Sequence, residues 1–172
     1  MVMWHSNLDP YVKILPTTSS SSLPILLSIP GLQPTAHIGV YLPTSGKEPE
    51  FISALSALDL IITTIKEEYS IPIYIRGDCN VNPKNKSRAA IFQHFCNKHE
   101  LSSLDLHHPT HHHFQGDGLY DAQLDVLLYA GPPAQAEILS EIICKLDNPL
   151  VQSHHDVIIS TIPLKKSCYQ RS

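Results

Sequence analysis

The sequence predicts a layered α/β fold with a single domain. Short apolar runs of strand length alternate with amphipathic helical segments along the chain, and no segment is repeated. The 14 prolines outnumber the 7 glycines, which favours frequent chain breaks over long uninterrupted helices. With 172 residues, 42% of them hydrophobic, the chain is long enough to bury one core.

Five apolar runs are predicted to be strands. They lie at 23–29, 37–42, 71–75, 124–129 and 157–161. Pro30 and Gly31 mark a turn after the first run, so we expect the first two runs to pair as neighbours in a sheet. The third run ends abruptly at Gly77, and its continuous apolar character is typical of a buried strand.

Three segments are predicted to be helices. Residues 50–69 carry one apolar stripe at helical spacing, formed by Phe51, Leu55, Leu58, Ile62 and Ile65. Residues 87–99 begin at Ser87, a good N-cap residue, and turn an apolar set inward that consists of Ile91, Phe92, Phe95 and Cys96. Residues 135–145 form the third predicted helix, and the serine-rich segment 17–22 is predicted to be a loop.

Composition and charge argue against several classes of protein. A formal net charge of -4 provides no basic surface for wrapping nucleic acid. The four cysteines, Cys79, Cys96, Cys144 and Cys168, form no C-x-x-C pair, which indicates reduced thiols in an intracellular protein. The chain begins without the basic and apolar regions of a signal peptide, and its longest apolar run is too short to span a bilayer. We therefore expect no membrane partner.

The first group of polar residues with chemical potential directly follows the predicted strand 71–75. Side chains alternate along extended chain, so Asp78 and Asn80 point the same way and Cys79 points the opposite way. A carboxylate beside an amide at a strand end can hold a metal ion, a water molecule or a phosphate oxygen. An Asx turn that opens a loop is the structural alternative.

Two further polar residues interrupt or precede apolar strands. Asp125 lies within the apolar run 124–129, where a buried carboxylate is costly unless a histidine, an arginine or a metal ion pairs with it. A solvated position on an edge strand is the alternative for Asp125. His155 precedes the run 157–161 and could stabilise charge on a phosphate near neutral pH. An ordinary surface position is the alternative for His155, because the chain has 11 histidines.

Taken together and in order, these segments resemble the endonuclease/exonuclease/phosphatase superfamily, in particular the endonuclease domains of non-LTR retrotransposons. The family pattern of V-Y-x-P, G-D-x-N, a Leu-Asp strand and S-D-H is matched by V-Y-L-P at 40–43, G-D-C-N at 77–80, L-D at 124–125 and S-H-H at 153–155. The P-T-H sequence at 109–111 resembles the Pro-Thr strand of the retrotransposon members. The resemblance spans residues 23–164.

The resemblance implies a deoxyribonuclease I-like α/β sandwich that cleaves phosphodiester bonds in DNA with Mg²⁺ or Mn²⁺. It implies that Asp78 and Asn80 position the attacking water, the phosphate and the metal ion. Asp125 would orient His155, which would stabilise the charge that develops on the phosphate. Tyr41 would bind the phosphate or assist the leaving group. A nuclear location and a reverse transcriptase module in the parent element follow from the same resemblance.

The chain also departs from the family pattern. His154 stands where the family has the aspartate of S-D-H, with Asp156 as a neighbouring carboxylate. The Asn-bearing first strand and the principal metal-binding glutamate of the family have no counterpart before residue 23, where Asp9 is the only acidic residue. We therefore expect an irregular segment at 1–22, a partial domain at 23–164 that is missing N-terminal strands, and a basic tail at 165–172.

Two other functions stay open at this point. The chain could be a catalytically inactive remnant that binds nucleic acid or a protein. Five histidines at 107–108 and 111–113 could instead bind Zn²⁺ or Ni²⁺. Adjacent histidines on a strand point to opposite faces, so a solvated loop is the favoured interpretation of the histidine-rich segment.

Overall fold

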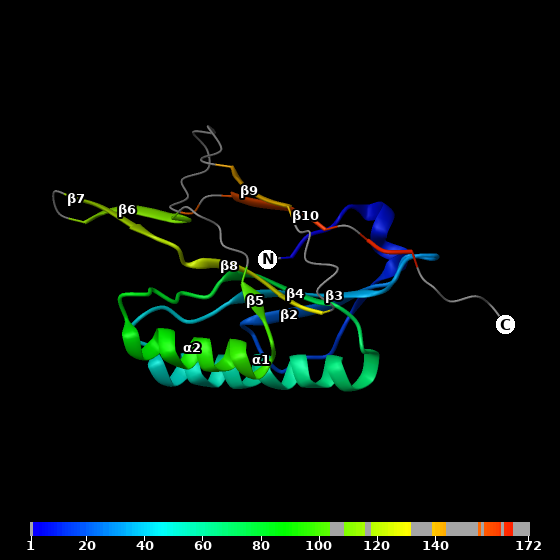
Figure 1. Cartoon of the computed structure of the whole chain (residues 1–172), viewed down its shortest axis with the longest axis horizontal. Helices are drawn as coiled ribbons and strands as arrows, with labels where there is room; N and C mark the ends of the chain where they lie inside the picture. The colour runs from blue at the N-terminus through cyan, green and yellow to red at the C-terminus, as the bar shows by residue number, and fades with distance from the viewer. Residues whose placement is uncertain are drawn as a thin grey trace.

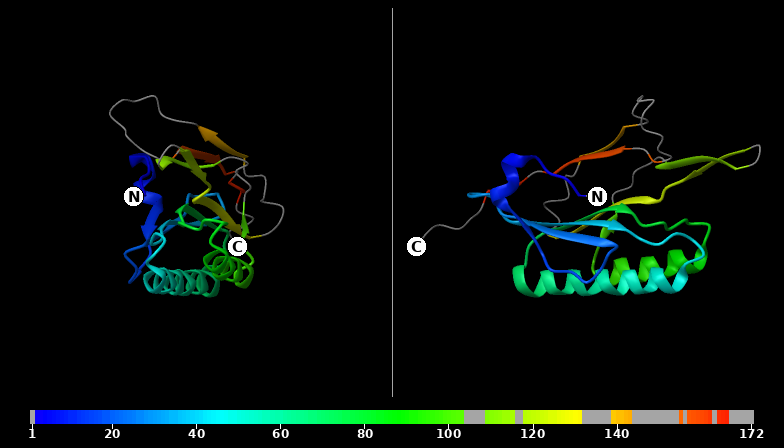
Figure 2. Two further views of the ribbon diagram at one scale, coloured as in Figure 1. Left: turned by 90° about the vertical axis from the view of Figure 1, so that its left-hand side faces the viewer. Right: turned by 180° about the vertical axis from the view of Figure 1, so that it is seen from behind.

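The molecule has three layers in its computed structural model, which describes residues 2–103, 109–115, 118–131, 139–143, 155, 157–162 and 164–166. A six-stranded mixed sheet lies in the middle (Figure 1). Two α-helices cover one face of this sheet, and two separate two-stranded sheets lie on the opposite side, as Figure 2 shows from two further directions. The predicted layered α/β fold is confirmed.

The central sheet has the strand order β1-β2-β3-β4-β8-β5. The strands are β1 Val12–Ile14, β2 Ser22–Leu27, β3 Thr35–Tyr41, β4 Ile73–Asp78, β5 Ser102–Ser103 and β8 Asp125–Ala130. β2 pairs with β3 as the sequence predicts, and β3 and β4 form the one parallel pair among these strands. A parallel pair needs a crossover connection, which the first helix supplies.

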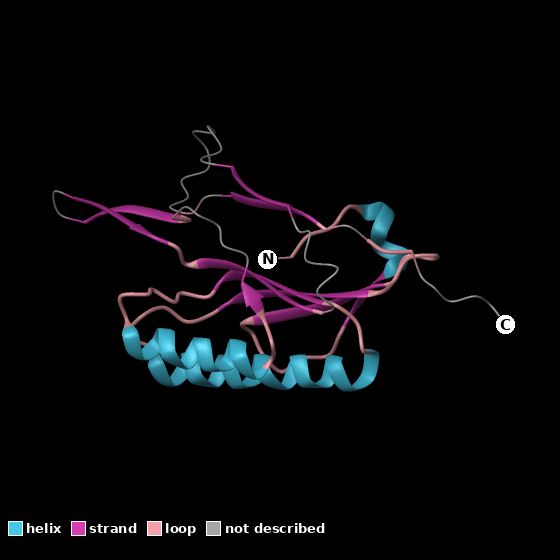
Figure 3. Cartoon of the chain, in the orientation of Figure 1, coloured by secondary structure: helices cyan, strands magenta, loops and turns pink. Residues whose placement is uncertain are grey.

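The two α-helices form one layer, at the bottom of Figure 3, whereas the 3-10 helix lies apart from them. α1 (Glu48–Tyr69) buries the whole predicted apolar stripe against the sheet. Its first turn contains Glu48, Pro49 and Glu50. Proline is favourable there because the first amides of a helix have no acceptor within the helix and proline has no N–H to leave unpaired. The two glutamates interact favourably with the positive end of the helix dipole. α1 ends at Ser70, which adopts the left-handed conformation with φ 45°.

α2 (Lys86–Lys98) begins and packs differently from the prediction in two respects. Asn85 is the N-cap residue, and its side-chain oxygen accepts a hydrogen bond of 3.2 Å from Arg88 N–H, whereas Ser87 lies inside the first turn. Phe95 and Cys96 are buried as predicted, but Ile91 is 39% exposed. The buried stripe is therefore rotated, and the charged Arg88 lies within it.

The predicted helix at 135–145 is wrong for the part that the structure describes. Residues Leu139–Ile143 form β9, which pairs antiparallel with β10 (Val157–Thr161), a strand that the sequence predicts correctly. Ile143 lies opposite Val157 and Ile142 lies opposite Ile158, and β-branched residues of this kind are common in strands. This strand partner lies 14 or more residues away along the chain, and a local helical pattern does not reveal it.

Two further segments are more regular than the sequence indicates. The N-terminal segment contains a 3-10 helix, Ser6–Tyr11, and β1, whose three residues pair with β2. Part of the predicted histidine-rich loop is β6 (His111–Gln115), which forms a hairpin with β7 (Gly118–Ala122). His107 and His108 lie outside the described residues. The predicted domain boundaries stay predictions.

The sheet face opposite the helices carries a row of aromatic rings. His37 of β3 stacks on Tyr74 of β4, and Tyr74 contacts Tyr129 of β8, each pair with ring centroids 5.2 Å apart. Thr35 and His37 form a side-chain hydrogen bond of 2.9 Å. Burial, together with the nearby Arg76 guanidinium, lowers the pKa of His37 from 6.5 to about 4.

The low pKa of His37 predicts a pH-dependent stability. Between pH 6.5 and about 4, His37 is protonated in the unfolded chain and neutral in the folded chain. Stability should therefore fall across this window as the pH is lowered, by at most about 3 kcal/mol. Thermal unfolding followed by circular dichroism should show a flatter pH profile for His37→Phe than for the wild type. His94→Phe, an exposed histidine on α2, is the control and should keep the wild-type slope.

Two findings bear on the predictions from composition. Cys79 and Cys96 are free and buried, in agreement with reduced thiols, while Cys144 and Cys168 lie outside the described residues. Among the residues that the structure describes, no helix has the length and apolar character needed to cross a membrane.

Candidate active site

Strand register brings three of the predicted site residues to one end of the sheet. Tyr41 at the end of β3 pairs with Asp78 at the end of β4. Asp78 in turn pairs with Asp125 at the start of β8. Residues paired across neighbouring strands lie about 5 Å apart, so the two carboxylates share one small region on the face opposite the helices.

The backbone around Asp78 departs from regular strand geometry. Gly77 has φ +135°, and a Cβ atom there would lie 2.0 Å from the Val40 carbonyl oxygen, so glycine is required. Asn80 has φ 51°, a left-handed conformation that asparagine tolerates better than most residues. The strand end therefore turns sharply through the G-D-C-N segment.

Two hydrogen bonds hold this turn closed. Asn80 N–H donates to Asp78 Oδ1 at 2.8 Å, which is the Asx turn considered as an alternative in the sequence. The Asn80 side-chain amide donates to the Leu42 carbonyl at 2.8 Å, so Asn80 also ties β4 to the end of β3. The structural and functional interpretations of Asp78 and Asn80 are therefore compatible, because a carboxylate that accepts from the turn keeps further lone pairs for a metal ion or a water molecule.

His155 connects the two carboxylates. Its Nδ1 lies 2.9 Å from Asp125 Oδ2, a hydrogen bond in which Nδ1–H donates to the carboxylate. This bond directs Nε2 toward Asp78, whose Oδ2 lies 3.9 Å away. That separation is too long for a direct hydrogen bond. Asp125 and His155 thus form an oriented pair that faces a second carboxylate across a short gap.

Burial makes the charge on Asp78 less favourable than usual. Asp78 and Asn80 are each 8% exposed. Burial raises the pKa of Asp78, and the neighbouring Asp125 carboxylate raises it further. The hydrogen bonds from Asn80 and the nearby His155 act in the opposite direction. A carboxyl group with a raised pKa is a better proton acceptor near neutral pH than an ordinary aspartate.

Two residues of the neighbouring hairpin support this pair. Thr110 is fully buried, and its Oγ1 accepts hydrogen bonds of 3.1 Å from the backbone N–H groups of both Leu124 and Asp125. The His111 ring packs edge-on against His155 with centroids 4.6 Å apart, and the two backbones form an isolated β-bridge. The sequence contained a signal for both residues only in the P-T-H segment at 109–111.

The chain is similar in fold to several solved structures. The endonuclease domain of TRAS1, a telomere-specific non-LTR retrotransposon, has a TM-score of 0.73 and 17% identity, over 95% of this chain and 72% of that chain. D. rerio TDP2 complexed with a single-strand DNA product has a TM-score of 0.57 and 14% identity, over 87% and 67%. The human Nocturnin catalytic domain with a bound sulfate anion has a TM-score of 0.54 and 14% identity, over 89% and 62%.

The chain has the fold of the endonuclease/exonuclease/phosphatase superfamily. The predicted resemblance is thereby confirmed at the level of the fold. No family model matches the sequence, and a search of curated proteins finds no match. At sequence identities of 14% to 17%, the structural similarity shows a shared fold and does not identify a substrate or an activity.

Within this deoxyribonuclease I-like fold, Arg88 of α2 anchors the loop that holds Asn80. Its side chain is 2% exposed and donates to the carbonyl oxygens of Asn80, at 2.9 Å, and Thr44, at 3.1 Å. It also pairs with Glu48 at 2.9 Å and lies 4.1 Å from the Phe51 ring centroid. Sequence reasoning missed Arg88, although an arginine at helical spacing with Phe92 and Phe95 was an available signal.

The donor set at the strand ends suits a hard divalent cation. Mg²⁺ binds oxygen ligands and commonly uses one or two carboxylates with water and substrate phosphate. Asp78 supplies a carboxylate, and a nearby cation would offset the unfavourable burial and the repulsion from Asp125. In the described part of the chain, no group of three histidine, cysteine or acidic side chains is arranged to hold a metal ion. The described residues therefore offer a partial set of ligands.

The structure brings together all five predicted site residues that it describes, namely Tyr41, Asp78, Asn80, Asp125 and His155. Tyr41 is the most open of them, with 62% exposure. Their chemical roles stay predictions. His154 and Asp156 lie outside the described residues.

Two histidines of the histidine-rich segment, His111 and His112, have different partners. His111 turns toward His155, whereas His112 pairs with Asp121 across the hairpin at 2.7 Å. This division follows from the alternation of side chains along a strand. A shared metal site for these two neighbours is therefore incompatible with the hairpin.

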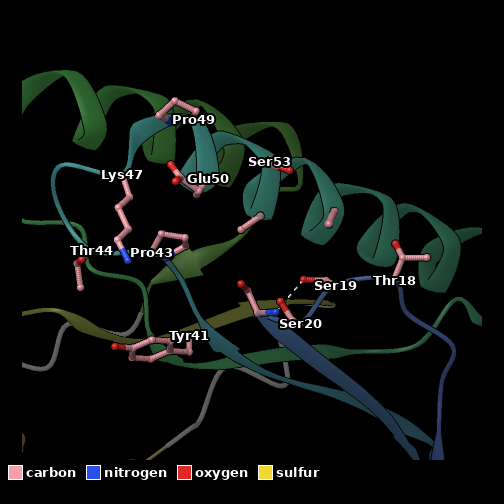
Figure 4. Close-up of a pocket in the computed structure, with 13 residues that line it drawn as sticks. Thr18, Ser19, Ser20, Tyr41, Pro43, Thr44, Lys47, Pro49, Glu50 and Ser53 are labelled. Carbon is pink, nitrogen blue, oxygen red and sulfur yellow. Dashed lines mark hydrogen bonds between the residues drawn. The ribbon is translucent and has the colours of Figure 1, made fainter.

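A polar groove begins at Tyr41 and runs along α1 (Figure 4). Its volume is about 760 Å³, and the serine-rich loop lines one side of it. Lys47 extends toward the loop that follows β3, and the Tyr41 hydroxyl points away from α1. The backbone N–H of Ser21 donates to Ser19 Oγ at 3.1 Å, so part of this loop is internally bonded.

Proposed function

We propose that the chain is a metal-dependent phosphodiesterase, and specifically a DNA endonuclease of retrotransposon origin. The observation that carries the proposal is the Asp125–His155 hydrogen bond of 2.9 Å, aimed at Asp78 across 3.9 Å. Hydrolysis of a phosphodiester needs an oriented donor for the phosphate oxygen and an acceptor for the proton of the attacking water. His155 would be the donor and Asp78 the acceptor, and the two side chains face each other across this gap.

In the proposed mechanism, Asp125 fixes the orientation of His155, and His155 Nε2 donates to a non-bridging phosphate oxygen. Asp78 orients the attacking water and accepts its proton. Tyr41, open to solvent beside Asp78, contacts the phosphate or the leaving group. A divalent cation held by Asp78 and Asn80 would neutralise negative charge on the phosphate.

The choice of DNA rests on similarity and on motifs. The neighbours in fold include a retrotransposon endonuclease domain and a TDP2 structure complexed with single-strand DNA. The order of V-Y-L-P, G-D-C-N and L-D resembles the retrotransposon members of the superfamily. A nuclear location and an adjoining reverse transcriptase module are the parts of the proposal that depend on this resemblance alone.

The second candidate is a module that binds nucleic acid without cleaving it. One observation favours it: the described residues contain no cluster of three acidic, histidine or cysteine side chains that could hold a metal ion. Under this alternative Asp78 and His155 would serve stability, and binding would not require a divalent cation.

The experiment is nicking of supercoiled plasmid by the purified chain in Mg²⁺, in Mn²⁺ and in EDTA, beside Asp78→Asn. The asparagine keeps an acceptor for the Asn80 N–H and removes the proton-accepting carboxylate. We expect nicking only with metal, and a loss of about 10²–10⁴-fold in the variant. A folded chain that binds DNA but nicks no faster than Asp78→Asn would support the binding module instead.

A further inference from the structure

Arg76 lies on the same sheet face as Asp78, two residues before it in β4. Side chains two residues apart along a strand share a face, at a separation of about 6.6 Å. In register, the neighbours of Arg76 are Gly39 in β3 and Leu127 in β8. Gly39 has no side chain, and the Val2 side chain fills the space over it. Arg76 lines a cavity together with Val2, Gly77 and Asp125, beside the candidate active site.

Arg76 is partly buried and unpaired. In the part of the chain that the structure describes, no acidic side chain forms an ion pair with Arg76, and its Nε is buried without a hydrogen bond. Burial lowers the pKa of Arg76. Placing a cation in such a position is costly unless an anion compensates for the lost water.

Arg88 provides the contrast within the same chain. It is more deeply buried than Arg76, yet it has two carbonyl acceptors, a carboxylate partner and an aromatic ring. This is the normal way in which a fold accommodates a buried arginine. Arg76 has none of these compensations within the described chain, which indicates that its partner comes from outside it.

Arg76 also lies where two cavities meet. One, of about 400 Å³, extends from His37 to Asp125 along the sheet face. The other, of about 580 Å³, extends from the serine-rich loop past Tyr41 to Asp78. Arg76 and Gly77 line both cavities. The second cavity shares Tyr41 and residues 19–21 with the groove of Figure 4, so connected hollows run along the molecule past Arg76 and Asp78.

We propose that Arg76 is a phosphate-binding residue that holds the nucleic-acid phosphate next to the one at Asp78 and His155. This proposal rests on the proposed function for the identity of the ligand and adds a binding subsite to it. Arginine suits the role because its planar guanidinium can donate two parallel hydrogen bonds to a phosphate. The strand spacing of two residues matches the distance between successive phosphates of an extended nucleic-acid strand.

The test measures binding without turnover. The purified chain in EDTA is titrated against a fluorescent single-stranded deoxyoligonucleotide of mixed sequence at several NaCl concentrations. Arg76→Gln should bind about tenfold more weakly, and its slope of log affinity against log salt should be shallower by about 0.7. Arg76→Lys should keep the slope and lose part of the affinity, because the charge remains while the paired donors are lost.

A matched charge control separates a local site from overall electrostatics. Lys98→Gln removes one exposed cation from α2, on the layer away from the proposed subsite, and should bind like the wild type. A set of oligonucleotides is also tested, each with one neutral methylphosphonate at a different position. At one of these positions the neutral linkage should weaken binding by the wild type and should not weaken binding by Arg76→Gln. Equal affinity and equal salt slope for Arg76→Gln and the wild type would overturn the proposal.

The stability of the variant provides an independent readout. Because the free protein carries Arg76 as an unpaired cation, Arg76→Gln should unfold at the same temperature or higher than the wild type. Lower stability would mean that Arg76 has a structural role, and would count against the proposal. If the wild type binds through Arg76 but nicks no plasmid, the phosphate subsite stands and hydrolysis fails. If nicking persists with an unchanged salt dependence in Arg76→Gln, hydrolysis stands and the subsite fails.

Discussion

Replacing His155 by alanine is expected to lower the rate of plasmid nicking by about 10²–10⁴-fold. His155 is the only group described in the structure that contacts Asp125 and faces Asp78 at the same time. Its removal takes away the donor for the phosphate oxygen and leaves Asp125 without its hydrogen bond. The measurement is the initial rate of conversion of supercoiled to open-circular plasmid at saturating Mg²⁺.

The expected loss belongs to the chemical step and not to the fold. His155→Ala should lower the unfolding temperature modestly, because the largely buried Asp125 loses its partner, but it should leave the chain folded, because His155 is partly exposed and lies outside the main apolar core. His112→Ala is the matched control, because His112 makes the same kind of histidine–aspartate contact on the hairpin, away from Asp78. Wild-type nicking by His155→Ala, or an equal loss in His112→Ala, would remove His155 from the mechanism.

Asp125→Asn separates the orientation of His155 from its presence. The asparagine can still contact Nδ1, but it neither carries a charge to stabilise an imidazolium nor fixes which nitrogen holds the proton. The rate should fall less than in His155→Ala, because the donor to the phosphate remains and only its orientation by the carboxylate is lost. A wild-type rate in Asp125→Asn would show that Asp125 does not position His155 for the reaction.

The sequence predicts much of this site because the site lies on regular strands. Asp78 and Asp125 are carboxylates at the ends of apolar runs, and a buried carboxylate is costly unless a partner compensates for its charge. The period of two along a strand then places Asp78 on the face opposite Ile75 and Leu128, which pack against the helices. The sequence does not predict the register between β4 and β8. The structure shows that this register pairs Asp78 with Asp125.

The residues that sequence reasoning missed act through long-range contacts. Thr110 accepts from the amides of Leu124 and Asp125, and Arg88 reaches the carbonyl of Thr44, which is 44 residues away. Such partners depend on how separate elements pack, and no local pattern contains that information. The wrong helix at 135–145 has the same cause, since pairing with β10 decides the conformation of β9.

Replacing Gly77 by alanine is expected to destabilise the fold by about 2–4 kcal/mol. The new Cβ atom would lie 2.0 Å from the Val40 carbonyl oxygen and 3.1 Å from its carbon. These are backbone atoms of β3, the strand that pairs with β4 beside Asp78, so they cannot rotate away as a side chain could. The φ of +135° adds a conformational cost for any residue with a side chain.

Gly46→Ala separates the two contributions to this loss. Gly46 also has a positive φ, +87°, but nothing lies within 4 Å of the position that its Cβ would occupy. It should therefore lose about 1 kcal/mol from backbone strain alone. Urea unfolding followed by circular dichroism measures both variants, and a loss in Gly77→Ala no larger than in Gly46→Ala would mean that β3 and β4 separate easily. The expected larger loss would instead show that the close approach of Gly77 to Val40 is what keeps Asp78 in register with Tyr41, where the proposed chemistry needs it.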